Sequence, residues 1–255
     1  FDPKIGKIME FDLHIHSRYS FDSLLPPKKI VEIAFRRGLS GIAVTDHNTI
    51  RGAKEAKLYA PPGFMVILGA EIDIEGCQLL GLFLKEEVLS KDPKAIAKEI
   101  KQQGGIIVLA HPGKEHKLPP QEILDLVDAV EGFNARLRNF GNIDANKIAH
   151  EISKAKQLPM IAGSDAHFGF EIGRGKLVAD NISSEQELKE RILTGNTSIS
   201  GQASSYYLDG LSKFVKAIKL RRPRTFLGAF YHLAKTSIEL IKGRERQKED
   251  GACLK

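Results

Sequence analysis

The stretch FDLHIHSRYSFDS, residues 11–23, places two histidines one residue apart beside an apolar run. In an extended strand alternate side chains point to the same face, so His14 and His16 project together while Leu13 and Ile15 point the other way. Two imidazoles on one edge of a strand can chelate a metal ion, and a pair of surface or hydrogen-bonded histidines is the plain alternative. The rest of the chain decides between these interpretations.

The first 200 or so residues alternate short apolar runs with amphipathic segments, which is the pattern of repeated β-α units around a mostly parallel sheet. Helix signals mark the boundaries. Prolines begin one helix that should stop at Gly38, and Asp92 caps a second. Ser184 and Glu187 form a capping box for a late helix that should end at Gly195. This pattern and the chain length suit a single α/β barrel.

The composition agrees with one globular domain. A chain of 255 residues with 42% hydrophobic residues can bury one large core. No apolar run reaches the roughly 20 residues that cross a bilayer, and the first ten residues lack the apolar core of a signal peptide, so a soluble, cytoplasmic protein is expected. Cys77 and Cys253 are too few for a disulfide framework, which fits a reducing compartment. Any metal must therefore use nitrogen and oxygen ligands.

Six predicted strands end on residues that can bind a metal. Taken one at a time, these residues could have purely structural roles: Asp165 could cap a turn, and His111 could be a hydrogen-bonded histidine. Glu71 is harder to explain, because a carboxylate beside an apolar strand is costly without a counter-charge. In a barrel the carboxyl ends of parallel strands open onto one face, so these residues are predicted to converge. In strand order they are His14 and His16, Asp46 and His47, Glu71, His111, Glu131 and Asn134, and Asp165 and His167.

The motif set H-x-H, T-D-H, an acid after the third strand, A-H-P and G-S-D-A-H strongly resembles the signature of the polymerase and histidinol phosphatase (PHP) superfamily. The matching segments DLHIHSRYSFDS, TDHNT, LGAEI, LAHP and GSDAH occur in order within roughly residues 9–201. The resemblance implies a distorted (β/α)7 barrel, a cluster of two or three divalent metal ions at its carboxyl-terminal face, and metal-dependent hydrolysis of a phosphoester.

The same resemblance implies eight metal ligands. One ion would be bound by His14, His16, Glu71 and Asp165, a second by Glu71 and His111, and a third by Asp22, His47 and His167. Imidazole and carboxylate ligands suit Zn, Mn or Fe. Two positions depart from the family. Gln78 stands where many relatives have a histidine, and arginines stand where a further histidine follows the fifth strand. The second ion would therefore have fewer protein ligands and complete its shell with water and phosphate.

Two kinds of residue are predicted to act beside the ligands. Asp46 is interpreted as a catalytic group that orients an imidazole or the substrate, with a turn-capping aspartate as the alternative. Arg136, also predicted to be catalytic, and Arg138 are predicted to hold substrate phosphate through paired hydrogen bonds, and Lys114 could supplement them. Exposed loop arginines are the plain alternative. Adjacent metal ions would lower the pKa of a bound water, so no serine or cysteine nucleophile is required.

The net charge of +6 belongs to the end of the chain. Residues 211–255 hold 12 Lys and Arg against 4 Asp and Glu, a net of +8. The sequence is therefore divided into a PHP barrel domain, residues 1–205, and a basic amphipathic helical extension, residues 206–255. Its helical pattern begins with Leu211, Phe214, Val215 and Ile218. These helices could pack on the barrel, or the basic side chains could bind nucleic-acid phosphates or an anionic membrane surface.

Three functions follow from these features. The first is a metal-dependent phosphoesterase that hydrolyses a small phosphate ester or a nucleotide with a metal-activated water. The second is a nuclease of the same chemistry that holds RNA or DNA through the basic tail. The third is a non-catalytic metal-binding module that recruits a partner through the tail. The near-complete ligand set favours an enzyme, and no residue identifies its substrate.

Overall fold

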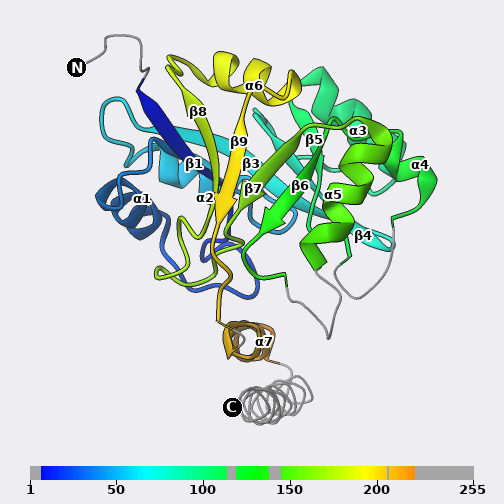
Figure 1. Ribbon diagram of the computed structural model, residues 1–255. Helices are drawn as coiled ribbons and strands as arrows, with labels where there is room; N and C mark the ends of the chain where they lie inside the picture. Colours follow the sequence, from blue (N-terminus) through cyan, green and yellow to red (C-terminus); the bar gives the residue numbers. More distant parts are fainter. Residues whose placement is uncertain (1–6, 114–118, 138–144, 206, 222–255) are drawn as a thin grey trace, which may run out of the picture. The chain divides into compact units, whose positions relative to one another are not determined.

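The computed structural model describes residues 7–113, 119–137, 145–205 and 207–221 (Figure 1). The chain divides into two compact units, Phe1–Ser204 and Ser205–Lys255. The first unit contains one nine-stranded sheet, and six of the seven helices found among the described residues belong to it. The predicted α/β architecture is confirmed.

Four of the eight neighbouring strand pairs in the sheet are parallel and four are antiparallel, so the sheet is mixed rather than mostly parallel as the sequence pattern predicted. The strand order is β7-β6-β5-β4-β3-β2-β1-β8-β9. Strands β1, β2 and β3 pair in parallel, as do β5, β6 and β7. Strand β4 is antiparallel to both neighbours, and β8 and β9 form an antiparallel edge. The strands are β1 (Ile8–Ile15), β2 (Gly41–Val44), β3 (Met65–Ile74), β4 (Cys77–Leu82), β5 (Ile106–Leu109), β6 (Ala129–Asn134), β7 (Met160–Gly163), β8 (Gly175–Asp180) and β9 (Ser198–Gly201).

The sheet is nearly closed into a barrel because β1, which pairs with β2 on one side, contacts both β8 and the segment after β7 on the other. Its first half pairs with β8, from Ile8 to Phe11. Its last residue, Ile15, forms a parallel bridge with Ala166, just after β7, and the backbone N–H of His16 donates to the Ala166 carbonyl at 2.8 Å. The expected distorted barrel is thus confirmed, and the ends of β1 and β7 meet where both strands carry site residues.

Two irregularities in the strand register fall within the site. The β1–β2 register shifts between Asp12 and Ile15, and the β6–β7 register shifts between Glu131 and Phe133. A bulge changes the direction in which nearby side chains point, and such features are common beside functional sites. The chain also departs from β-α alternation at one place. Strands β3 and β4 form a hairpin, in whose two-residue turn Gly76 adopts a φ of 86°.

The helices begin where the sequence indicates. Helix α1 (Pro27–Arg36) starts on a proline and is followed by Gly38 at φ 79°. The Asp92 side chain accepts from the Ala95 N–H at 2.9 Å and caps α3 (Pro93–Gln102). Ser184 accepts from the Glu187 N–H and caps α6, but Glu187 accepts from Ser183 rather than from Ser184. The other helices of this unit are α2 (Arg51–Lys57), α4 (Gln121–Leu124), α5 (Ala145–Lys156) and α6 (Glu185–Leu193).

Three apolar clusters hold the first unit together. One lines the sheet and includes Phe11, Leu13 and Ile67, together with Leu188 and Ile192 of α6. Figure 1 shows α6 across the end of the sheet at which β1 begins. The second cluster packs α3 and α4 against β4, β5 and β6, and the third packs α1 and α2 against β2. Polar side chains, rather than these clusters, occupy the carboxyl ends of the parallel strands.

In the second unit, helix α7 (Tyr207–Lys219) covers the start of the predicted helical pattern. Val215 is buried as that pattern predicts, but Leu211 and Ile218 are exposed. The basic cluster beyond Arg221 and the second apolar stretch lie outside the described residues, so the basic extension stays a prediction. Among the helices described, none has both the length and the apolar character that a membrane span requires.

Candidate metal centre

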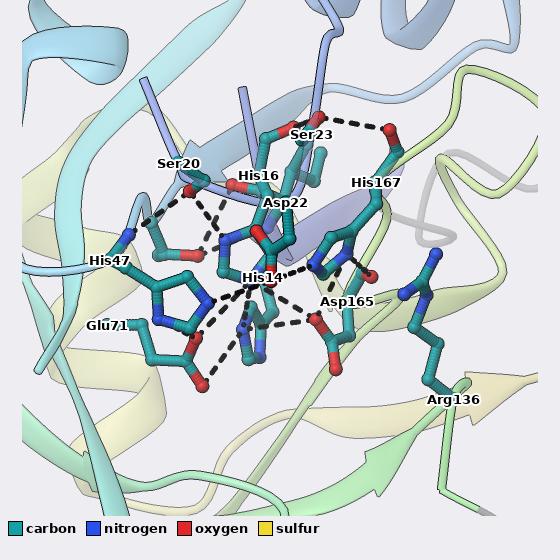
Figure 2. A network of polar contacts seen from close by, with 12 residues as sticks. His14, His16, Ser20, Asp22, Ser23, His47, Glu71, Arg136, Asp165 and His167 are labelled. Atoms are coloured by element: carbon teal, nitrogen blue, oxygen red, sulfur yellow. Dashed lines mark hydrogen bonds and ion pairs between the residues drawn. The ribbon is translucent and has the colours of Figure 1, made fainter. Parts of the chain in front are cut away.

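The eight predicted ligands lie together at the carboxyl ends of the strands, in one group that we name the metal-ligand cluster. Figure 2 labels all of its members except His111. Five strands and the β1–α1 loop contribute to it. Six members are buried, and two, Asp22 and His47, are half-buried. The members are His14 in β1, His16 after β1, Asp22 in the loop, His47 after β2, Glu71 in β3, His111 after β5, and Asp165 and His167 after β7.

Glu71 lies at the centre of the cluster. Its Oε1 is 2.7 Å from His111 Nε2 and 3.7 Å from His14 Nε2. Its Oε2 is 3.1 Å from His47 Nδ1 and 3.4 Å from His16 Nε2. One carboxylate therefore faces four imidazoles on two sides, which is the arrangement expected of a ligand shared between two ions.

A compact group of three residues lies beside Glu71. His14 Nε2 and His16 Nε2 are 3.1 Å apart. Asp165 Oδ1 is 3.2 Å from His16 Nε2 and 3.6 Å from His14 Nε2. These donor atoms point toward one small region, as a shared cation would require.

A second group surrounds Asp22. Its Oδ2 is 3.3 Å from His47 Nε2 and 3.2 Å from His167 Nε2. Asp22 Oδ1 is buried and makes no hydrogen bond with any described residue. His47 Nδ1 also lacks one, because its approach to Glu71 is a close contact without hydrogen-bond geometry. Buried polar atoms normally have a partner, so these two atoms fit a site at which a cation would bind.

Hydrogen bonds orient the two β1 histidines. His14 Nδ1 lies 2.9 Å from Glu131 Oε1, and His16 Nδ1 lies 3.0 Å from Ser20 Oγ, whose own proton goes to Asp46. Nδ1 of each ring is therefore a donor, and Nε2 of each ring faces the cluster. With both rings in the neutral form that binds a metal, the two Nε2 lone pairs would face each other and two carboxylates, and a cation between them would relieve the repulsion.

The electrostatics of the cluster differ between its side chains. Against the effect of burial, Glu131 and Asp165 raise the pKa of His14 well above its usual value, and Glu71 and Asp22 raise the pKa of His47 to about 10, so a bound metal ion would displace a proton from each of these two rings. Burial would raise the pKa of Glu71, but His47 and His111 hold that pKa well below its usual range. Burial and the neighbouring His167 lower the pKa of His16 to about 3, so its ring is neutral at physiological pH. Ionised carboxylates and neutral imidazoles are the forms that bind divalent metals.

Two ligands have strained backbones. Asp165 has φ 53° and His111 has φ 26°, in a region that residues with a Cβ rarely adopt. Such conformations cost free energy and persist only where surrounding contacts impose them, most often at functional sites. The strain supports a functional reading of both residues over the turn-capping and hydrogen-bonding alternatives.

Asp46 lies behind the ligands. Its carboxylate accepts from the Ser17 N–H and hydroxyl, both at 2.6 Å, and from the Ser20 hydroxyl at 2.7 Å. Ser20 in turn accepts from His16 Nδ1. Gly52 in α2 permits this arrangement, because a Cβ there would lie 1.9 Å from Asp46 Oδ2. Asp46 therefore reaches His16 through Ser20, and the orienting role predicted for it stays a prediction.

Replacing Ser20 by alanine is expected to weaken metal binding by roughly 10–100-fold, the cost of losing an orienting partner. The His16 ring would lose the acceptor that holds its proton on Nδ1. Calorimetric titration of the metal-free protein with Mn²⁺ measures the effect. Ser17→Ala is the matched control, since Ser17 also donates to Asp46 but contacts no cluster histidine through its hydroxyl. Equal affinities for the two variants would contradict the relay.

Glu131 was noted in the sequence as a strand-end acid but was not predicted to be a site residue. It is fully buried and accepts from His14 Nδ1 and, at 2.8 Å, from the His111 N–H. The Asn134 amide donates to it at 3.0 Å, and the same amide is 3.4 Å from Asp165 Oδ2. Glu131 thus orients two ligands from behind. An acid within an apolar strand was the signal that could have identified it.

The predicted phosphate-binding residues have different outcomes. Lys114 and Arg138 lie outside the described residues. Arg136 forms a bidentate ion pair with Glu171, with its Nε 2.8 Å and a terminal amine 2.6 Å from the carboxylate. Glu171 is fully buried and also accepts from the His167 and Phe168 N–H groups, both at 3.1 Å. Arg136 therefore supports the backbone of a predicted ligand, and phosphate binding by it stays a prediction.

Gln78, the residue found where many relatives have a histidine, lies on β4. Its amide donates to Asp73 Oδ1 at 2.7 Å, and that oxygen is 3.7 Å from His47 Nδ1. Gln78 thus contacts the cluster through Asp73, and the reduced protein ligand set expected for the second ion stays a prediction.

Comparison with known proteins places these features in a family. The model of the PHP domain family matches residues 12–173. An uncharacterized protein of Methanocaldococcus jannaschii is 38% identical over 160 residues, which cover 56% of this chain and 94% of that protein. A solved two-domain protein of Bacteroides vulgatus, described as containing a predicted PHP-like metal-dependent phosphoesterase, superposes with a TM-score of 0.67. The two are 22% identical over 77% of this chain and 66% of that one.

A shorter similarity connects the chain with a nuclease. A 5'-3' exoribonuclease of Haemophilus influenzae is 37% identical over 78 residues, which cover 29% of this chain and 28% of the exoribonuclease.

Proposed function

The chain belongs to the PHP domain family, and from this membership and the geometry of the metal-ligand cluster we propose that it is a metal-dependent phosphoesterase. Its substrate would be a phosphate ester of a small molecule or a nucleotide. The observation that carries the proposal is the convergence of eight imidazoles and carboxylates, in which four imidazoles lie within 3.7 Å of the Glu71 carboxylate. Such an arrangement is costly unless cations occupy it.

Bound divalent ions would neutralise the phosphate oxygens and lower the pKa of a bound water from 15.7 towards about 7. The chain contributes the positions of the ligands. Glu131 and Ser20 hold the Nδ1 protons of His14 and His16, so that both Nε2 atoms face the cluster. The Asp165 carbonyl, 2.8 Å from His167 Nδ1, directs the other nitrogen of that ring to Asp22.

Two or three divalent ions, Zn, Mn or Fe, are the proposed cofactors. The side chains that could bind them form overlapping groups, in which His14 and His16 each belong to two. A ligand set of nitrogen and oxygen atoms suits all three metals. Metal analysis combined with anomalous scattering from crystals would count and identify the ions.

The protein is expected to release phosphate from a generic aryl phosphate when Mn²⁺ is supplied, and to lose this activity with a chelator or with His14→Ala. The loss follows because His14 Nε2 faces His16, Glu71 and Asp165 together. His150→Gln is the control, since His150 lies on α5 and contacts the Gly132 carbonyl. Metal binding without phosphate release from any phosphoester tested would favour the non-catalytic binding module.

A nuclease of the same chemistry is the second candidate, favoured by the segment shared with the exoribonuclease. A nuclease would bind its RNA or DNA strand through basic side chains. Its Kd would then rise with salt concentration, whereas a small phosphate ester would show little such dependence.

A further inference from the structure

The two ring nitrogens of His47 face different carboxylates. Its Nε2 lies 3.3 Å from Asp22 Oδ2, in the group that surrounds Asp22. Its Nδ1 is buried and makes no hydrogen bond with a described residue, although Glu71 Oε2 is 3.1 Å away and Asp73 Oδ1 is 3.7 Å away. The predicted ligand set explains the surroundings of Nε2 but gives no role to Asp73.

Two amide side chains hold the Asp73 carboxylate beside His47. Asn48 Nδ2 donates to Asp73 Oδ2 at 2.7 Å, and the Asp73 N–H donates to Asn48 Oδ1 at 3.1 Å, so these two residues form a closed pair. Gln78 lies opposite Asp73 in the β3–β4 hairpin, and its Nε2 donates to Asp73 Oδ1 at 2.7 Å. Because a carboxylate oxygen has two acceptor positions, Oδ1 can accept a second proton donor from the side of His47.

The backbone fixes this arrangement to β3. The Asn48 N–H donates to the Glu71 carbonyl at 2.8 Å, and His47 and Glu71 form a parallel bridge. Asn48 has φ 54°, in a region that residues with a Cβ rarely adopt, although asparagine does so more readily than most. Such a conformation persists where surrounding contacts impose it. The residue after His47 is thus held to the strand that carries both Glu71 and Asp73.

An aromatic ring fixes the plane of the His47 imidazole. The Phe21 ring stacks on it with centroids 4.3 Å apart and an angle of 10° between the planes. Stacking leaves the in-plane direction of the two nitrogens to be set by the groups at the edge of the ring. Those groups are Asp22 on the Nε2 side and Glu71 and Asp73 on the Nδ1 side.

The proton on Nδ1 needs an acceptor when Nε2 faces a cation. A neutral imidazole that offers Nε2 as a ligand carries its proton on Nδ1, and metal-binding histidines usually donate that proton to a carboxylate or a carbonyl. The Glu71 carboxylate also faces His14, His16 and His111, and it is itself a predicted ligand. Asp73 belongs to none of the groups of possible metal ligands found among the described residues. Its carboxylate is therefore available to the Nδ1 proton.

We propose that Asp73, held by Asn48 and Gln78, accepts the Nδ1 proton of His47 and so positions this ring for a cation in the group around Asp22. Asp73 would be a positioning residue and not a ligand. A shortening of about 0.5–1 Å brings the 3.7 Å separation into hydrogen-bond range. The inference rests on the proposed metal-dependent function and adds a carboxylate that lies outside the predicted ligand set.

The test combines calorimetric titration of the metal-free protein with Zn²⁺ and nuclear magnetic resonance of the Zn²⁺-loaded protein. Asp73→Asn keeps the size of the side chain and removes the charge. We expect it to weaken one Zn²⁺ site by roughly 10–100-fold and to leave the others unchanged. In wild type the His47 Nδ1 proton should give a slowly exchanging resonance, which Asp73→Asn should abolish. Gln78→Ala should have a smaller effect, because Asn48 still holds Asp73.

Asp125→Asn is the matched control, since Asp125 likewise accepts from a glutamine amide, that of Gln121, but pairs with Lys156 rather than with a histidine of the cluster. An Asp73→Asn variant that binds Zn²⁺ as wild type does and keeps the Nδ1 resonance would overturn the inference while leaving the phosphoesterase intact. Loss of every Zn²⁺ site at once, or a wild-type His47 without a proton on Nδ1, would also overturn it. Failure of the wild type to bind Zn²⁺ at all would instead reject the proposed function.

Discussion

Glu71→Gln is expected to lower divalent metal affinity by more than the roughly 100-fold that loss of an orienting partner costs, and to abolish phosphate release from an aryl phosphate. The reason is its position. The carboxylate faces four imidazoles on two sides, and its negative charge would stabilise the cations that these imidazoles bind. The amide of glutamine keeps the shape but removes the charge and one acceptor.

Elemental analysis after dialysis against Mn²⁺ and a phosphate-release assay measure the two effects. Glu75→Gln is the matched control, since Glu75 lies four residues further on, exposed in the β3–β4 turn. A Glu71→Gln variant that retains the wild-type metal content would show that the ions bind elsewhere.

Arg136→Met is expected to destabilise the first unit by about 3–5 kcal/mol, the cost of leaving a buried charge without its partner. Glu171 is fully buried, and Arg136 supplies its only cation among the described ion pairs. For a unit of this size the unfolding midpoint should fall by roughly 10 °C. Metal affinity should fall too, because Glu171 also holds the His167 N–H.

Thermal and denaturant unfolding of the metal-free protein measure this loss, and the double variant Arg136→Met/Glu171→Met completes a cycle. The double variant should recover part of the stability, since no buried charge is then left alone. If Arg136→Met instead left the unfolding midpoint unchanged and raised KM for phosphate esters, Arg136 would act mainly on the substrate.

Local sequence patterns predicted the elements well because their causes are local. Proline at a helix start, the Asp92 cap and a glycine beyond a helix end act within one turn of chain. The β3–β4 hairpin escaped this reasoning. The same apolar run suits a parallel or an antiparallel strand, and only its pairing with both β3 and β5 distinguishes them.

Candidate ligands could be named from sequence because histidines and carboxylates that follow apolar strands are unusual and costly. Most of the residues that support them could not. Ser20 and Glu171 are ordinary residue types whose partners are set by the fold. Glu131 carried a signal as an acid within an apolar strand, but its contact with His14 spans 117 positions and no local pattern indicates it. The ion pair of Arg136 with the buried Glu171 was likewise not expected from the sequence, which suggested only a phosphate contact for a guanidinium in a loop.

The predicted ligands and the alternation of strands and helices could be read from the sequence, because residue type and spacing are properties of the chain. How the predicted ligands face one another depends on the folded chain. Strand β1 pairs with β8 at its start and reaches the residue after β7 at its end, and this closure brings His14 and His16 to Asp165. The positions of donor atoms depend on such long-range pairings, to which no local pattern refers.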